Sequence, residues 1–238
     1  MESIKVWFLE QSAPFHRLSR EELQQLDSLS KMAVYRQGEQ IFFENEPALH
    51  VYLLKKGRIK VSRYLPDGKE IVVGIIEPGM LFGELSLVDS QHYHRESAQA
   101  LSDSLVCIFP FRDFLNFLHE HPKVMFEVTK WLGGRLQRYQ QCISDLLFKD
   151  APQRIASLLL QLLEQLPEYQ QRNAAGPPYE IAPFLAQKDL ATLCGVSRQT
   201  LSTILSQWQR DGIVEVRRRG LVVKDVKALQ KLAGEWKT

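Results

Sequence analysis

The sequence is poor in cysteine. Its 238 residues include three, Cys107, Cys142 and Cys194, which stand far apart. An odd number of scattered cysteines supplies neither a disulfide framework nor the paired spacing of a structural metal site, so we expect no bound metal. Such cysteine usage is typical of a reducing compartment, and we therefore expect a cytoplasmic protein.

The sequence also lacks long apolar runs. No stretch approaches the roughly 18 residues that a membrane span requires, so we expect no membrane contact. The short apolar run near the N-terminus has charges on both sides and no small-residue cleavage site, unlike a signal peptide. No glycine-rich phosphate loop follows an expected strand, and no paired-carboxylate cleft or nucleophile motif is evident. These absences exclude nucleotide hydrolases and dinucleotide-binding enzymes, and we expect no enzyme activity.

The charge is unevenly distributed, although the whole chain carries only +2. From residue 181 onward, lysine and arginine outnumber aspartate and glutamate by ten to five, whereas the preceding part is mildly acidic. A basic C-terminal segment on an acidic body is typical of a protein that meets a polyanion at one end. A solvated basic surface would give the same count, so the charge alone leaves both interpretations open.

Residues 34–110 have the pattern of β structure. Short β-branched or aromatic runs are separated by glycines or turn pairs, and they lie at residues 40–43, 51–54, 59–64, 71–76 and 104–109. Asp67-Gly68 stands between two of these runs and predicts a hairpin with a type I′ turn, in which both residues have positive φ. Many short, evenly spaced strands favour a β-barrel or jelly roll.

After Phe111 the apolar period changes to about three and a half residues, which predicts one long helix. Steps of three and four, with Thr129 as the polar member, give a seam of Met125, Leu132, Leu136, Tyr139, Ile143 and Leu146. This spacing is typical of a coiled-coil dimer interface, although packing on the helix's own domain would give the same pattern. Gly133-Gly134 costs about 1 kcal/mol per glycine relative to alanine, which a close partner helix or a hinge would offset.

A second domain begins near Asp150. This residue is a good N-cap for a following helix, with Pro152 tolerated in the first turn. The pattern predicts an amphipathic helix over residues 155–166, followed by a polar loop over residues 167–178.

The strongest signal is a helix-turn-helix in residues 187–210. The pattern predicts a helix at 187–194, a tight turn at Gly195, and a second helix at 198–210 that Ser197 caps. Leu201, Ile204, Leu205 and Trp208 would face inward. Arginine pairs with guanine and glutamine with adenine in the major groove, so we expect base contacts from the exposed residues Arg198, Gln199, Ser202 and Thr203.

A basic hairpin follows the second helix. Residues 212–216 and 221–223 predict two short strands, and their connection carries Arg217, Arg218 and Arg219, suited to phosphate contacts. Lys188, on the first helix of the motif, completes the expected DNA contacts. A three-helix packing motif without a DNA role would leave the arginine tip unexplained.

The chain then resembles a known family. The motifs lie in order at residues 35–42, 54–61, 66–70, 78–85, 154–156 and 195–200. Over residues 18–231 the sequence resembles the Crp/Fnr superfamily, the cyclic-AMP receptor protein and fumarate–nitrate reductase regulators. The resemblance implies an α+β fold with a cyclic-nucleotide-binding-like β-roll at 1–120, a dimerisation helix at 121–149 and a winged helix-turn-helix at 150–238. It also implies a homodimer on near-palindromic double-stranded DNA, with RNA polymerase as a further partner.

The resemblance also locates an effector pocket. In the cyclic-AMP-binding members, a Phe-Gly-Glu-Leu run and an Arg-Ser-Ala run hold the ribose and the cyclic phosphate, and the matching residues here are Gly83, Glu84, Leu85, Ser97 and Ala98. Glu96 stands where the arginine belongs, and Arg95 lies one residue early. Tyr139-Gln140 replace the Thr-Ser pair that meets adenine. Because a carboxylate facing a phosphate reverses the electrostatics, we expect that cyclic AMP is not the effector.

Other effectors are open to the same reasoning. The iron–sulfur members carry an N-terminal cysteine cluster, and no cysteine precedes Cys107 here, so we expect no cluster. His92 and His94 flank the pocket loop and could be haem ligands, although histidines in a polar loop are more often exposed to solvent. A regulator without an effector, controlled by its own abundance, remains open. A cyclic-nucleotide regulatory subunit of an enzyme is disfavoured by the helix-turn-helix and the basic wing.

Overall fold

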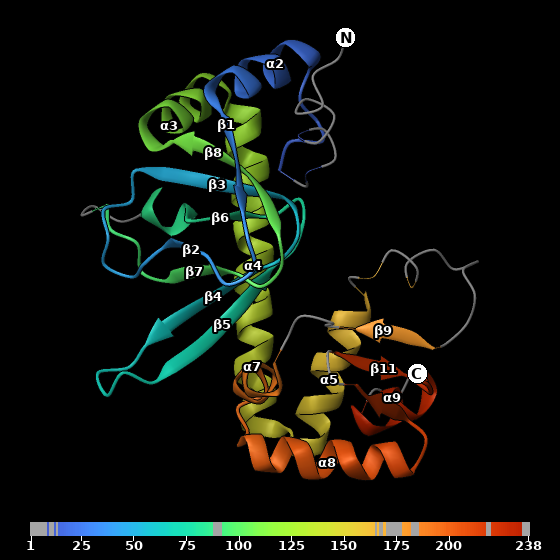
Figure 1. Ribbon diagram of the computed structural model, residues 1–238. Coiled ribbons are helices and arrows are strands. Elements are labelled where there is room, and N and C mark those ends of the chain that lie inside the picture. The colour runs from blue at the N-terminus through green and yellow to red at the C-terminus, as the bar shows by residue number, and fades with distance from the viewer. Residues whose placement is uncertain are drawn as a thin grey trace. The chain divides into compact units, whose positions relative to one another are not determined.

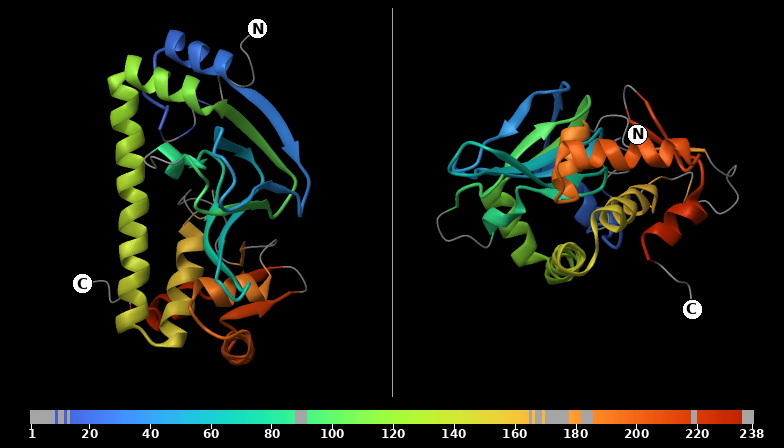
Figure 2. Two further views of the ribbon diagram at one scale, coloured as in Figure 1. Left: turned by 90° about the vertical axis from the view of Figure 1, so that its left-hand side faces the viewer. Right: turned by 90° about the horizontal axis from the view of Figure 1, so that it is seen from below.

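The computed structural model describes residues 9, 12, 14–87, 92–164, 166, 169, 178–181, 186–217 and 220–234. The chain divides into two compact units, Met1–Arg138 and Tyr139–Thr238. The boundary lies within one long helix, α4 (Pro122–Phe148), which is continuous in Figures 1 and 2. The helix expected at residues 121–149 is therefore present as one element, and each unit contains part of it.

The first unit is built on two four-stranded antiparallel sheets (Figure 1). One has the order β1-β8-β3-β6 and the other β2-β7-β4-β5. The strands are β1 (Lys31–Tyr35), β2 (Gln40–Phe42), β3 (His50–Lys56), β4 (Ile59–Tyr64), β5 (Glu70–Ile76), β6 (Leu81–Phe82), β7 (Ser97–Ala100) and β8 (Ser104–Pro110). The expected β-rich N-terminal domain is confirmed, and every predicted run lies in or overlaps a strand.

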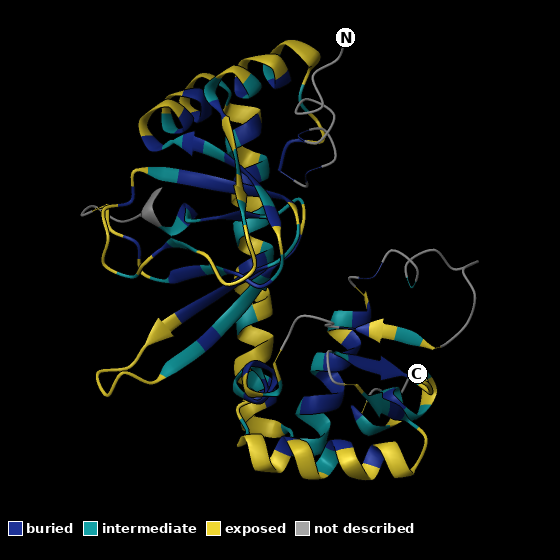
Figure 3. Cartoon of the chain, viewed as in Figure 1, coloured by how far each residue is buried: buried dark blue, intermediate teal, exposed yellow. Residues whose placement is uncertain are grey.

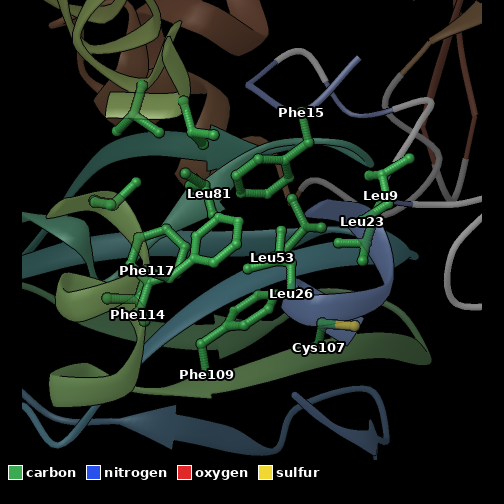
Figure 4. Packing of buried hydrophobic residues seen from close by; sticks show 14 of the residues in the cluster. Leu9, Phe15, Leu23, Leu26, Leu53, Leu81, Cys107, Phe109, Phe114 and Phe117 are labelled. Atoms are coloured by element: carbon green, nitrogen blue, oxygen red, sulfur yellow. The ribbon is translucent and has the colours of Figure 1, made fainter. Parts of the chain in front are cut away.

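Strand β3 contributes to two hydrophobic cores, because successive side chains of a strand point to opposite faces of its sheet. Tyr52 and Leu54 belong to a cluster that both sheets share. Val51 and Leu53 belong to a second cluster, which includes Phe109, Phe114 and Phe117 (Figure 4). The helices α2 (Arg20–Leu29), α3 (Phe111–Glu120) and the first turns of α4 complete this second cluster.

The β4–β5 hairpin has a different turn from the one predicted. Of the two predicted turn residues, Gly68 has a positive φ, of 79°, but Asp67 does not. Gly68 N–H donates to Leu65 O at 2.8 Å, and Leu65 N–H donates to Lys69 O at 2.9 Å. The type I′ prediction is therefore wrong, because Pro66 holds its own φ near −65°, which suits a type I turn followed by a left-handed glycine.

The second unit combines helices with a small sheet of order β10-β11-β9. Its elements after α4 are α5 (Ala151–Glu164), β9 (Tyr179–Ile181), α7 (Gln187–Leu193), α8 (Arg198–Arg210), β10 (Val214–Val216), β11 (Leu221–Val223) and α9 (Val226–Leu232). The predicted Asp150 cap is confirmed: Gln153 N–H donates to Asp150 Oδ1 at 2.8 Å. The expected helix-turn-helix and hairpin wing are both present.

In the part of the chain that the structure describes, no helix combines the length and the apolar character needed to cross a lipid bilayer.

Candidate nucleic-acid interface and sensor pocket

Helix α8 separates a buried face from an exposed one (Figure 3). Leu201, Leu205 and Trp208 are buried, and Ile204 is half-buried, as the pattern predicts. The predicted base-contacting residues are all exposed: Arg198, Gln199, Ser202 and Thr203. Thr203 donates its hydroxyl proton to Gln199 O at 3.0 Å, within the helix. The first turn therefore presents an arginine and a glutamine side by side at the exposed start of the helix.

The start of α8 is fixed by its cap and by the preceding turn. Ser197 Oγ accepts a hydrogen bond of 3.0 Å from Thr200 N–H, which satisfies one of the free donors of the first turn. Gly195 has a φ of +62°, a backbone conformation that favours glycine. Lys188 lies on α7 and is exposed. The expected N-cap and tight turn are thus both confirmed.

The wing differs from a free cationic tip. Arg217 Nε donates to Glu215 at 3.0 Å, and its guanidinium lies 3.7 Å from Glu180. Lys224 pairs with the same Glu215 at 2.7 Å. The hydrogen bonds from Lys224 and Arg217 lower the pKa of Glu215. Arg217 is therefore part of an ion-pair network on the wing, whereas Arg218 and Arg219 lie outside the described residues.

A cavity of about 390 Å³ lies between the helix-turn-helix and the wing. Arg198 and Arg217 both line it, together with the apolar side chains of Leu190, Leu205 and Leu221. The two arginines therefore border one cavity in the second unit, together with leucine side chains.

In the first unit, the residues that the resemblance assigns to a pocket differ in exposure. Gly83 has a φ of +73°, and Glu84 begins the short 3-10 helix η1 (Glu84–Leu87). Ser97 is buried and accepts a hydrogen bond of 2.9 Å from Glu44 N–H. Ala98 is buried in the core between the sheets, Leu85 is half-buried and Arg95 is exposed. Tyr139 and Gln140 belong to the second unit, so their place beside adenine stays a prediction.

A residue that sequence reasoning missed joins the two acidic positions of the pocket. Arg135 of α4 pairs with Glu84, and its other terminal nitrogen lies 3.4 Å from Glu96. The side chains of Arg135, Glu84 and Glu96 are 9%, 0% and 15% exposed, respectively. Arg135 also lies over the ring of Trp131, at 5.9 Å from its centroid. One buried guanidinium therefore bridges the glutamate of the Phe-Gly-Glu-Leu run and the glutamate that replaces the phosphate arginine.

The charges of this triad do not balance, since two carboxylates share one guanidinium. Burial raises the pKa of both Glu84 and Glu96, and Arg135 opposes this rise in each case. Glu84 Oε2 is buried and has no hydrogen-bond partner among the described residues. Arg63 and Glu44, which pair at 3.2 Å, also act on Glu96, with opposite signs. The pocket is thus an acidic site that its own arginine partly neutralises.

A signal for Arg135 was present in the sequence. Val124 and Val128 are buried on α4, and Arg135 follows on the same face at helical spacing. A charged residue in a buried stripe requires a partner, because an unpaired buried charge is very costly. The sequence could therefore have indicated a buried ion pair, but not which carboxylates complete it.

The two histidines differ from the expectation for a polar loop. His92 is exposed, but His94 is 4% exposed, so the expectation is wrong for His94. Its ring stacks on Phe42, with the centroids 3.7 Å apart and the planes 9° from parallel. Burial lowers the pKa of His94 to about 4, so the imidazole is neutral near pH 7. Burial of the ring in a stack with Phe42 fits a structural histidine better than a haem ligand.

The predicted seam residues of α4 lie in different environments. Met125 and Leu132 are half-buried and pack against the core of the first unit. Leu136 and Ile143 are each 58% exposed. Leu146 lies against Gly195, where a Cβ would be 2.5 Å from Leu146 Cδ2. A longer exposed row repeats at steps of three and four and consists of Phe126, Thr129, Gly133, Leu136, Gln140, Ile143 and Leu147.

Comparison with known proteins agrees with this architecture. Residues 32–121 match the cyclic nucleotide-binding domain, and residues 153–232 match the Crp-like helix-turn-helix domain. The chain is 28% identical to the "CRP-like cAMP-activated global transcriptional regulator" of Mycobacterium tuberculosis, over 84% of this chain and 86% of that protein. It is 29% identical to the "Cyclic AMP receptor protein" of Thermus thermophilus, over 92% of this chain and 95% of that protein.

A solved structure shows the same fold. FixK2 from Bradyrhizobium japonicum superposes with a TM-score of 0.74 at 24% identity, covering 87% of this chain and 99% of that chain. With both domains matched in order, the chain belongs to the Crp/Fnr family: it is a DNA-binding transcription regulator with an effector-binding domain, and not an enzyme.

Proposed function

We propose that this regulator acts as a homodimer that reads DNA with α8. We propose further that its sensor, in which Arg135 pairs with Glu84 and Glu96, does not bind cyclic AMP. One observation carries the sensor part: buried Arg135 bridges Glu84 and Glu96. The DNA part rests on the exposed first turn of α8, and the dimer part on the exposed row of α4. RNA polymerase, which the family implies as a partner, would contact the dimer bound at its DNA site.

Base reading is assigned to the start of α8. Arg198 and Gln199 are exposed in its first turn, and Ser202 follows one turn later. Arginine and glutamine suit guanine and adenine edges in the major groove. Arg217 and, from the sequence alone, Arg218 and Arg219 are assigned to the phosphate backbone, with Lys188 from α7. Loss of Arg198 would therefore cost about 1–3 kcal/mol and relax the preference at one base pair per half-site.

A selection from randomised DNA tests this assignment. The wild type, Arg198→Ala and Arg210→Ala are compared, since Arg210 is also exposed but lies at the opposite end of α8. Arg198→Ala is expected to lose one preferred base per half-site, whereas Arg210→Ala keeps the wild-type sequence. An unchanged selected sequence for Arg198→Ala would contradict the assignment.

The dimer is assigned to the exposed row of α4. Leu136, Ile143 and Leu147 are 58%, 58% and 72% exposed, and a coiled-coil partner would cover them. Gly133 lies on the same row, and among the described residues nothing outside its own stretch of helix lies within 4 Å of where a Cβ would be. It would let a partner helix approach closely, which offsets the cost of a glycine inside a helix. A two-fold dimer would place half-site centres about 34–36 Å apart.

The sensor is assigned a ligand other than cyclic AMP, although the similar proteins of M. tuberculosis and T. thermophilus are named for cyclic AMP. A cyclic phosphate is an anion and requires a cationic fork where this chain has Glu96. Arg135, the cation that pairs with Glu96, is already shared between two carboxylates. A phosphate at this place would face a net negative site.

Calorimetry with cyclic AMP tests this assignment. The wild type is expected to show no binding at micromolar concentrations. Glu96→Arg restores a cation before Ser97 and is expected to bind more tightly than the wild type. Asp113→Arg carries the same charge change on the exposed side of α3 and is expected to change nothing. Micromolar binding by the wild type would overturn the proposal.

The same observation favours a second candidate function, a regulator without any effector. Arg135 supplies, from within the chain, a cation to both carboxylates of the pocket, so their burial does not depend on a bound small molecule. Native mass spectrometry of the purified dimer on operator DNA distinguishes the two: this second function predicts a complex with the mass of protein and DNA alone.

A further inference from the structure

A second arginine, Arg154 of α5, joins the end of α4 to the turn of the helix-turn-helix. Its guanidinium donates three hydrogen bonds to backbone carbonyl oxygens: to Lys149 at 2.7 Å, Cys194 at 2.8 Å and Gly195 at 3.3 Å. Lys149 follows the last residue of α4, whereas Cys194 and Gly195 form the turn before α8. One side chain therefore ties together two segments that are more than forty residues apart.

The chemistry of this contact suits arginine. The last carbonyl groups of a helix have no partner inside the helix, and they carry the negative end of its dipole. A planar guanidinium offers five N–H donors in a fixed fork, so it reaches several carbonyls at once. A lysine ammonium is a compact point charge and cannot span the same three oxygens in one orientation.

Two further contacts lie at the same corner. Leu146 Cδ2 is 2.5 Å from where a Cβ on Gly195 would be, so the last turn of α4 lies directly against this turn. Lys149 Nζ bonds Asp145 at 3.1 Å and Ser157 at 2.7 Å, which ties α4 to α5. The end of α4, the start of α5 and the turn at 194–195 are therefore held together by charged and apolar contacts.

We propose that Arg154 is a positioning residue for DNA recognition, which fixes the start of α8 relative to the end of α4. The proposal rests on the proposed function in one respect, that α8 reads the bases. Ser197 caps α8 only two residues after Gly195. A shift of the turn therefore moves Arg198 and Gln199 directly. Arg154 itself donates its hydrogen bonds to carbonyl oxygens, and it contributes to specificity by positioning these two residues.

The test compares Arg154→Lys and Arg154→Ala with Lys149→Met. Lys149 belongs to the same corner, but the hydrogen bonds of its side chain go to Asp145 and Ser157 and not to the turn at 194–195. The measurements are the affinities for operator and for scrambled DNA at several salt concentrations, each corrected for the folded fraction. Hydrogen exchange of the peptide covering residues 194–205 is measured on the free proteins.

Both Arg154 variants are expected to bind the operator about tenfold more weakly, the effect of losing roughly one charge-assisted hydrogen bond. Binding to scrambled DNA and the salt slope should stay unchanged, because no phosphate contact is lost. Exchange at 194–205 should become faster. Lys149→Met is expected to lower the melting temperature but to keep the ratio of operator to scrambled affinity.

Three results would overturn the proposal. The first is an Arg154→Lys variant that keeps the wild-type ratio of operator to scrambled affinity. The second is an Arg154 variant whose salt slope falls by the amount of a full phosphate contact. The third is a Lys149→Met variant that loses as much of this ratio as the Arg154 variants do. If the Arg154 variants do not fold, Leu146→Ala loosens the same turn from the α4 side and should lower the ratio in a protein that is still dimeric. An unchanged ratio of operator to scrambled affinity in Leu146→Ala would also contradict the proposal. Failure of the wild type to select any sequence would instead refute the proposed function.

Discussion

Arg135→Met is the most informative single change in the sensor. It preserves most of the buried volume but leaves Glu84 and Glu96 without their shared cation. Removing one partner of a buried ion pair costs about 3–5 kcal/mol, because the remaining charge is buried and uncompensated. The side chains here are 15% exposed or less, so solvent screening reduces this cost little. For a unit of this size, the loss corresponds to a melting temperature lowered by roughly 10–20 °C.

The effect of Arg135→Met should also depend on pH. Burial raises the pKa of both glutamates, so the folded state binds their protons more tightly than the unfolded state. Stability from these protons is complete below the unfolded pKa and is lost as the pH rises through the folded values. Arg135 lowers both folded values in the wild type, so its removal raises them further. The destabilisation should therefore be smaller at pH 5 than at pH 8.

Chemical denaturation of the full chain at both pH values is the assay, with the transition of the sensor followed separately. Arg138→Met is the matched control, because Arg138 is exposed on the same helix one turn later. It should stay within about 0.5 kcal/mol of the wild type. Adding Glu84→Gln and Glu96→Gln to Arg135→Met should recover most of the loss, since no buried charge remains. A loss below about 1 kcal/mol at pH 8, or a loss independent of pH, would refute the reasoning.

Three further predictions follow from single contacts. Replacing Leu136 and Ile143 together by lysine should give monomers and abolish tight operator binding, because both lie on the exposed row of α4; light scattering that still detects a dimer would contradict this. Ser197→Ala should cost about 1 kcal/mol through loss of the α8 cap, measured by denaturation, with Ser206→Ala on the exposed face of α8 as control. Gly83→Ala should cost about 1–2 kcal/mol, because φ is +73° and the new Cβ would lie 2.9 Å from the Tyr52 ring; wild-type stability would show that the loop adapts.

The fold was largely predictable, because local pattern and tertiary structure agree in most of the chain. The runs that contain β-branched or aromatic residues became β2, β3, β4, β5 and β8, and the helix-turn-helix spacing became α7 and α8. Strand β7 was missed because Ser-Ala-Gln-Ala has little β propensity. It is extended because it pairs with β4 on one side and β2 on the other. Such a strand is defined by its neighbours and not by its own residues.

The seam of α4 shows a different limit. Periodicity gives the apolar positions of a helix, but it does not say whether they meet the helix's own domain or a partner. Met125 and Leu132 fit the heptad, yet they pack into the sensor core. Leu136 and Ile143 fit the same heptad and are exposed. Only the burial of each residue separates the face that is already covered from the face left for a second copy.

The effector pocket shows why a family resemblance carries the fold further than the ligand. The sequence alone identified Glu96 as a departure that reverses the charge at the phosphate position. It could not show what makes a buried glutamate tolerable there. The fold brings Arg135, which lies 39 positions after Glu96 in the sequence, next to this carboxylate. The same guanidinium also pairs with Glu84. Because Arg135 lies beside Glu96, placing an arginine at position 96 alone would leave Arg135 facing a like charge. Phosphate binding in this pocket therefore depends on positions 96 and 135 together. The coupling between them is measured by comparing Glu96→Arg with the double variant Glu96→Arg/Arg135→Gln in the cyclic AMP titration. Tighter binding by the double variant is expected if Arg135 repels the arginine introduced at position 96, whereas weaker binding would mean that Arg135 itself contacts the phosphate.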